Sequence, residues 1–81
     1  MQLNSQALAK TVAVLDGAFW FLVMGFSLLT GVGQMTLTTL GSFHPWFTYS
    51  WGGWVIIVIE HLIGGYILGY IFAWVYNRFS R

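Results

Sequence analysis

The sequence contains no cysteine and very little charge. Without cysteine the chain can form neither a disulfide framework nor a thiolate metal site. Three basic and two acidic residues make up only 6% of the chain, against about 25% in soluble domains. So few charges cannot cover a surface that faces water. Because 58% of the residues are also hydrophobic, the composition predicts an integral membrane protein.

Several functional signatures are absent as well. The net charge of +1 provides no basic patch, so we expect no nucleic-acid partner. The chain has no Ser/His/Asp or Cys/His set, no HExxH, no GxGxxG and no phosphate loop. We therefore predict no catalytic residues and no enzymatic activity. No metal site is predicted either, with His61 as the one candidate ligand.

A first apolar run, Val12–Leu29, predicts a transmembrane helix over about residues 9–30. Asn4 or Ser5 can cap its start, because a short side-chain oxygen accepts a free backbone N–H. The length of the run, the acidic Asp16 within it and the lack of an A-x-A site argue against a cleaved signal peptide.

A second apolar run predicts a transmembrane helix over about residues 53–76, which Arg78 brings to an end. No internal repeat or composition boundary divides the chain. The sequence therefore predicts an all-α membrane fold with a single domain over residues 1–81. This domain is an antiparallel hairpin of two transmembrane helices, joined by an interfacial aromatic loop over residues 31–52.

The basic residues predict an orientation. Lys10 precedes the first span, Arg78 and Arg81 follow the second, and the connecting loop has no Lys or Arg. Because Lys and Arg concentrate on the cytoplasmic side, both termini should be cytoplasmic and the loop should lie outside.

Aromatic residues cluster where the spans should meet the headgroups. Tyr and Trp prefer this interface because their rings are amphipathic. A short interfacial helix is expected before Pro45. The predicted anchors are Trp46, Tyr49, Trp51 and Trp54 on the outer side, and Trp74 and Tyr76 on the inner side.

The helical rise of about 1.5 Å per residue gives a first register for the hairpin. If Lys10 and Arg78 lie level at the inner interface, Asp16 lies about 9 Å into the bilayer and Glu60 about 27 Å. The two carboxylates are then at different depths and do not share a proton within one chain.

That register places Glu60 beside Ser27 and Thr30, whose hydroxyls could form hydrogen bonds with it. One interpretation of Glu60 is a neutral carboxylic acid bonded between helices, since burial favours the uncharged form. The other is an ion- or proton-carrying carboxylate, because ionisable groups within a membrane are often functional. Asp16 lies nearer the interface, where water or a basic partner can reach it.

The second span carries a ridge of small residues. Gly65 and Gly69 are four residues apart, Ala73 continues the series, and Gly64 removes further bulk. Small residues at this spacing let helix backbones approach closely, so the ridge predicts a helix-packing face.

His61 is the candidate cofactor ligand. A neutral imidazole can bind a haem iron or a chlorophyll magnesium, although a lone histidine is more often hydrogen-bonded to a neighbour. His44 is expected at the interface, which leaves the spans without a second histidine for bis-His haem. Trp20, near the middle of the first span, favours a protein or cofactor neighbour there.

Both ends of the chain resemble an uncharacterised family of small two-helix bacterial membrane proteins. The residues that carry the resemblance are Leu3-Asn4, Ala7-Leu8-Ala9 and the segment Gly65–Phe79. The resemblance implies a hairpin in the bacterial cytoplasmic membrane and carries no activity with it.

The chain also resembles the ring subunit c of rotary ATP synthases in its length and in placing Glu60 in the second helix. It departs from that family in the first span, which lacks the alternating glycines, and in the loop, which is long, aromatic and uncharged. We therefore treat this likeness as coincidental.

Three functions are compatible with the sequence. The leading hypothesis is a non-catalytic accessory subunit of a larger membrane complex, respiratory or photosynthetic, with other membrane subunits and lipids as partners. It would pack against core helices and could hold a lipid, quinone or pigment. The first alternative is a homo-oligomeric proton or cation channel that uses Glu60. The second is a module that binds haem or a chlorophyll-type pigment through His61.

Overall fold

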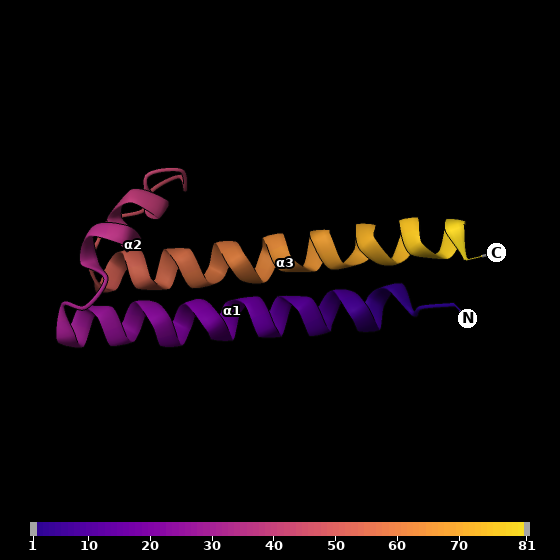
Figure 1. The fold of residues 1–81 in the computed structure, drawn as a ribbon, viewed down its shortest axis with the longest axis horizontal. Helices are drawn as coiled ribbons and strands as arrows, with labels where there is room; N and C mark the ends of the chain where they lie inside the picture. Colours follow the sequence, from indigo (N-terminus) through magenta and orange to yellow (C-terminus); the bar gives the residue numbers. More distant parts are fainter. Residues whose placement is uncertain (1, 81) are drawn as a thin grey trace.

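The computed structural model describes residues 2–80 and contains three helices. Helix α1 covers Ser5–Thr30, α2 covers Gln34–Gly41 and α3 covers Trp51–Phe79. The described residues contain no β-strand. In Figure 1, α1 and α3 lie side by side and antiparallel, so that both chain ends are at the same end of the hairpin. The short α2 lies at the opposite end, where it contacts α1.

Each long helix begins at a polar cap. The Asn4 side chain accepts a hydrogen bond from the Ala7 N–H at 2.9 Å, which confirms the predicted cap. Ser50 caps α3 in the same way by accepting from the Gly53 N–H at 3.1 Å. Helix α1 ends at Gly31, whose φ of 79° is a left-handed conformation that glycine adopts without strain.

The two long helices are 26 and 29 residues long and are apolar enough to span a membrane. They confirm the predicted two-helix hairpin and extend beyond the predicted bounds of residues 9–30 and 53–76. The helix expected before Pro45 is α2, which contains 8 residues. Only 22% and 17% of the most apolar stretches of α1 and α3 are buried within the hairpin, so most of their surface faces outward.

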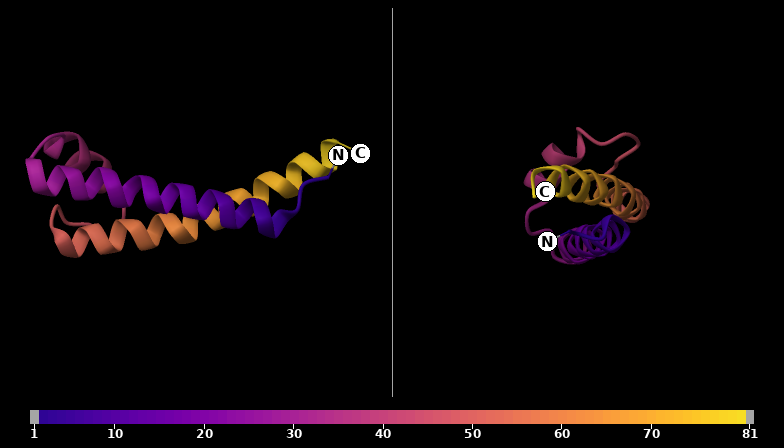
Figure 2. Two further views of the ribbon diagram at one scale, coloured as in Figure 1. Left: turned by 90° about the horizontal axis from the view of Figure 1, so that it is seen from below. Right: turned by 90° about the vertical axis from the view of Figure 1, so that its right-hand side faces the viewer.

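Helices α1 and α3 meet through small residues on both sides. A Cβ atom added at Gly69 would lie 2.9 Å from the Cα of Ala9, and one at Gly65 would lie 3.0 Å from the Cα of Ala13. These contacts are with backbone atoms, so the helices approach closely in this segment. The left view of Figure 2 shows the two helices crossing there. The predicted ridge of Gly65, Gly69 and Ala73 therefore packs on α1, and Ala73 is fully buried.

These contacts set a register that differs from the predicted one. Lys10 lies opposite about residue 68 of α3, and not opposite Arg78. The shift is about ten residues, or about 15 Å along the helix axis. The prediction assumed that the basic residues end both spans at one level, but the close packing of small side chains fixes the register. The opposed residues are Ala9 with Gly69, Ala13 with Gly65, and Gly17 with Leu62.

A small apolar core closes the loop end of the hairpin. Met24 from α1, Leu37 from α2 and Ile57 from α3 are buried against one another. Each helix thus contributes one side chain, and α2 is held against the hairpin by apolar burial rather than by backbone pairing.

Two hydrogen bonds close the opposite end. The Leu3 N–H donates to Asn77 Oδ1 at 2.7 Å, and the Asn77 amide donates back to the Leu3 carbonyl at 2.8 Å. Asn77 is half-buried, so these bonds are partly shielded from water. They join the extended N-terminal residues to the last turn of α3.

We expect Asn77→Ala to release the residues before α1, because it removes both bonds at a cost of about 1–2 kcal/mol. Amide hydrogen exchange at Leu3 is the measurement, and it should accelerate at least about fivefold. Asn77→Asp is the matched control, since it keeps an acceptor for the Leu3 N–H and should have a smaller effect. Equal exchange at Leu3 in all three proteins would show that the pair does not hold this end.

Candidate functional site

Four ionisable side chains, two acidic and two histidine, lie at similar depth in the hairpin. In the observed register Glu60 and His61 are level with about residues 18–20 of α1, close to its middle. Asp16 then differs from Glu60 by about three residues, or roughly 5 Å along the axis. The prediction that Asp16 and Glu60 lie at different depths is therefore wrong, because it rested on the incorrect register. We call Asp16, His44, Glu60 and His61 the polar layer.

His61 is held in one orientation by two contacts. Its ring stacks on the indole of Trp20, with centres 4.6 Å apart and planes 26° apart. Its Nδ1–H donates to the Ile57 carbonyl at 2.9 Å. The neighbour that Trp20 predicts is thus provided within the chain, and His61 bonds to its own helix rather than to Glu60.

His44 reaches the same place from the loop. Its ring centre lies 5.0 Å from that of His61 and 6.2 Å from that of Trp20. Its Nδ1–H donates to the Leu40 carbonyl at 3.1 Å. From the sequence, His44 is expected in the interfacial loop, and this contact with His61 is not predicted. In Figure 1 the segment after α2 turns back along the hairpin, and the ring-centre distance places the two imidazoles in contact.

The turn of this loop includes an unfavourable backbone conformation. Trp46 has a φ of 60°, and within residues 2–80 it is the one non-glycine residue with a positive value. A left-handed conformation costs a bulky L-residue roughly 1–2 kcal/mol. Beside it, the Phe47 ring packs directly on Gly41, where a side chain larger than hydrogen would not fit.

Glu60 has an enclosed oxygen that is not satisfied. Its Oε1 is buried and makes no hydrogen bond with any described residue. Asp16 is half-buried and likewise forms no hydrogen bond or ion pair with residues 2–80. The unpaired, enclosed Oε1 of Glu60 costs about 1–3 kcal/mol. Both residues are only partly covered, so each carboxyl group can still accept a hydrogen bond from outside the chain through an open oxygen.

The expected hydrogen bonds from Ser27 and Thr30 to Glu60 do not form. The observed register places both hydroxyls nearer the C-terminal end of α1 than the level of Glu60. The Tyr49 hydroxyl donates to the Ser27 carbonyl at 3.0 Å, and the Ser27 and Tyr49 hydroxyls lie 2.6 Å apart. The phenol has a single hydrogen, so the Ser27 hydroxyl donates to the Tyr49 oxygen. The Thr30 hydroxyl donates to the Phe26 carbonyl at 2.8 Å.

The predicted aromatic anchors fall into two groups. Trp46 is 84% exposed and Trp51 is 51% exposed, and both face outward. Trp54 instead turns into the hairpin, where its indole N–H donates to the Phe21 carbonyl at 3.0 Å. Tyr49 is half-buried through its bond to Ser27. At the other end Trp74 and Tyr76 are exposed, and the guanidinium of Arg78 lies 5.0 Å above the Trp74 ring.

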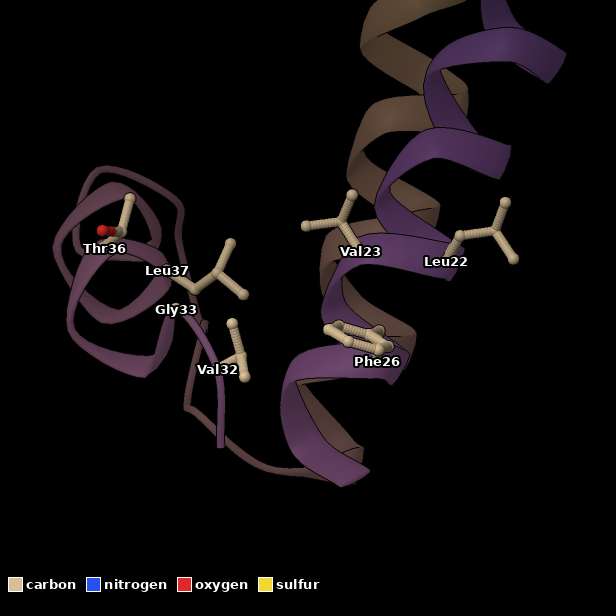
Figure 3. Close-up of a pocket in the computed structure, with 7 residues that line it drawn as sticks. All are labelled: Leu22, Val23, Phe26, Val32, Gly33, Thr36 and Leu37. Carbon is tan, nitrogen blue, oxygen red and sulfur yellow. The ribbon is translucent and has the colours of Figure 1, made fainter. Parts of the chain in front are cut away.

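An apolar groove of about 630 Å³ lies between α1 and the start of α2. Figure 3 shows Val23 and Phe26 of α1 across from Val32 and Leu37, and Leu22 also lines the groove. The one polar side chain that lines it is Thr36. Its volume is within the roughly 300–1,000 Å³ of small-molecule sites.

The structure also identifies contributors that the sequence analysis missed. Ala9, Ala13 and Gly17 recur every four residues on α1 and are all buried. This spacing is visible in the sequence and is the counterpart of the ridge on α3. Gly64, by contrast, has no atom within 4 Å of an added Cβ, so it does not contribute to the α1 contact.

Within the described residues, no group of three or more His, Cys, Asp or Glu side chains could hold a metal ion. The polar layer therefore provides two imidazoles and two separate carboxyl groups rather than a complete metal centre. In comparisons with known proteins, no protein-family model, curated protein or solved structure matches the chain.

Proposed function

We propose that this chain is a non-catalytic accessory subunit of a larger membrane complex, respiratory or photosynthetic in type. The observation that carries the proposal is the unsatisfied Glu60 carboxyl group in the middle of an apolar hairpin. A polar group in lipid needs a partner, because no water is available to satisfy it. Although Oε1 is enclosed, Glu60 is only partly covered and its other oxygen, Oε2, is not among the buried unpaired atoms, so a donor on a neighbouring helix can reach the carboxyl group there.

The outer surface supports assembly with other helices. Large apolar side chains are exposed along both long helices, including Phe19, Phe26 and Phe72. The groove beside Val23 and Leu37 has the size and chemistry for an apolar tail, such as that of a lipid or quinone. A hairpin of this kind would fill the space between larger subunits and lipid.

The proposed location is the bacterial cytoplasmic membrane, with both termini in the cytoplasm and the loop outside. Lys10 and Arg78 lie toward the open end of the hairpin, Arg81 follows Arg78 in the sequence, and the loop has no basic residue, so the charges favour this orientation.

The polar layer favours one second candidate, a homo-oligomeric proton or cation channel. Several copies would bring their Glu60 and Asp16 groups to the same depth, as a conducting path requires. In that case Glu60→Gln would abolish ion flux into liposomes while the oligomer stays assembled. A pigment- or haem-binding role for His61 would instead give a visible absorption band.

Gentle purification from the native membrane, followed by mass spectrometry and an absorption spectrum, tests the proposal. We expect larger membrane subunits to co-purify with the tagged chain in fixed ratio. Glu60→Ala should reduce this co-purification by about tenfold, equivalent to 1.4 kcal/mol, and Glu60→Gln should reduce it less because the amide still accepts a hydrogen bond. Gln6→Ala, at an exposed position, is the control. Recovery of the chain as a monomer, or as an oligomer of itself alone, would contradict the accessory role.

A further inference from the structure

The tautomers of His44 and His61 are fixed by their hydrogen bonds. Each Nδ1 lies within 3.1 Å of a backbone carbonyl four residues earlier, Leu40 for His44 and Ile57 for His61. A carbonyl oxygen only accepts, so each Nδ1 carries the hydrogen. In the neutral ring the lone pair is then on Nε2. Neither Nε2 forms a hydrogen bond with any other part of the described chain.

This arrangement is the one found in metal-binding histidines. Such a residue usually donates its second ring N–H to a carbonyl or carboxylate, which fixes the ring and makes the ligating nitrogen more basic. Here both histidines have that support. His61 is further held by the stacked Trp20 ring at 4.6 Å.

The spacing of the two rings fits a shared ion. Two imidazoles bound through Nε2 at about 2.0–2.1 Å to one tetrahedral ion have ring centres about 5 Å apart. The observed separation is 5.0 Å, with the planes tilted by 38°. His44 and His61 come from different segments, so one ion between them would also tie the loop to α3.

We propose that His44 and His61 bind a transition-metal ion of the Zn²⁺ or Cu²⁺ class through their Nε2 atoms. Imidazole nitrogen suits these ions, whereas Mg²⁺ and Ca²⁺ prefer oxygen ligands. No third protein ligand completes the site among the described residues, so water or a group from another chain occupies the remaining positions. The site is independent of the accessory role proposed above.

The test is a Zn²⁺ titration against a chromophoric chelator, with the full chain in mild detergent and a purification tag that lacks histidine. We expect one Zn²⁺ per chain. His44→Gln and His61→Gln should each weaken binding by at least about tenfold. Gln6→Ala is the control, because it changes an exposed residue at the start of α1 without removing an imidazole, and its affinity should stay within about threefold of the original.

Electron paramagnetic resonance of bound Cu²⁺ provides the second readout, which does not depend on affinity. The expected spectrum shows coupling to two imidazole nitrogens, and each single histidine variant should show one. His44 is in the loop, so its variant keeps the α1–α3 contacts even if His61→Gln misfolds. Equal metal binding by the double histidine variant would show adventitious binding, and the absence of binding at submillimolar Zn²⁺ would equally overturn the proposal.

Discussion

Gly65→Ala and Gly69→Ala should each weaken the pairing of α1 and α3 by about 1–3 kcal/mol. A Cβ at either position meets the Cα of an alanine on α1, at 3.0 Å for Gly65 and 2.9 Å for Gly69. Backbone atoms cannot rotate out of the way, so the whole helix must move. The gain in helix propensity from glycine to alanine, up to about 1 kcal/mol, offsets only part of this cost.

Gly64→Ala is the matched control. It adds the same methyl group next to Gly65, but no atom lies within 4 Å of it. The propensity gain is then unopposed, so the pairing should be unchanged or slightly stronger. Alanine at Gly65 is thus expected to weaken the pairing, whereas alanine at the adjacent Gly64 is not.

The absence of cysteine simplifies the measurement. Spin labels on Gln6→Cys and Phe79→Cys, both at exposed positions, report the separation of the helix ends as a denaturing detergent is added. The midpoint for Gly65→Ala and Gly69→Ala should fall, and that for Gly64→Ala should not. The same decrease for all three would indicate that a general effect of alanine, and not contact with α1, is responsible.

Gly53→Ala should detach the loop from the hairpin, with a cost at or above the upper end of the usual 1–3 kcal/mol. A Cβ at Gly53 would coincide with the Thr48 carbonyl, because the chain folds tightly over the first turn of α3. The Ser50 cap and the bond between Tyr49 and Ser27 both depend on that turn. Gly52→Ala is the control, since the nearest atom to its added Cβ is the Ser50 hydroxyl at 3.7 Å.

Hydrogen exchange at the Gly53 and Trp54 amides measures the loss of the cap. Both amides donate to Ser50, the first to its side chain at 3.1 Å and the second to its carbonyl at 2.8 Å. Exchange should accelerate strongly in Gly53→Ala and little in Gly52→Ala. The Zn²⁺ affinity should fall with it if His44 is displaced. Unchanged exchange in Gly53→Ala would mean that the turn can open without cost.

The parts of the fold that depend on local signals could be predicted from the sequence. Apolar runs of sufficient length define the two spans, and Asn4 starts α1 because its side chain bonds to an amide three residues away. The small-residue ridge of Gly65 and Gly69 could also be predicted from the sequence, since residues four apart lie on one face of a helix.

The depth of the candidate residues could not be predicted from charge alone. Placing Lys10 level with Arg78 assumed that both spans end at the same height, whereas α3 extends well past Lys10. The register follows from the fit of Ala9 and Ala13 against the α3 glycines. That fit depends on the complementarity of two helix faces, which neither span reveals separately.

The contact between His44 and His61 could not be predicted from local sequence signals either, for a different reason. It requires the loop to reverse near Trp46, which adopts a left-handed conformation that a tryptophan disfavours. Sequence propensity predicts against such a turn, so only the tertiary packing of Phe47, Gly41 and the α2 core can maintain it. The resemblance to small bacterial hairpins stays a prediction.

In the observed register of α1 and α3, the two long helices differ in the length of apolar helix that a bilayer must cover. From Lys10 to the end of α1 at Thr30 the helix rises about 30 Å, which equals the hydrocarbon thickness of a bilayer. Helix α3 continues about ten residues beyond the level of Lys10, and exposed Phe72 and Trp74 lie in this overhang. A bilayer can cover that extension only if the hairpin tilts or the membrane thickens locally. Lys10 would then snorkel along α3 toward the headgroups, which would make the protein sensitive to acyl-chain length.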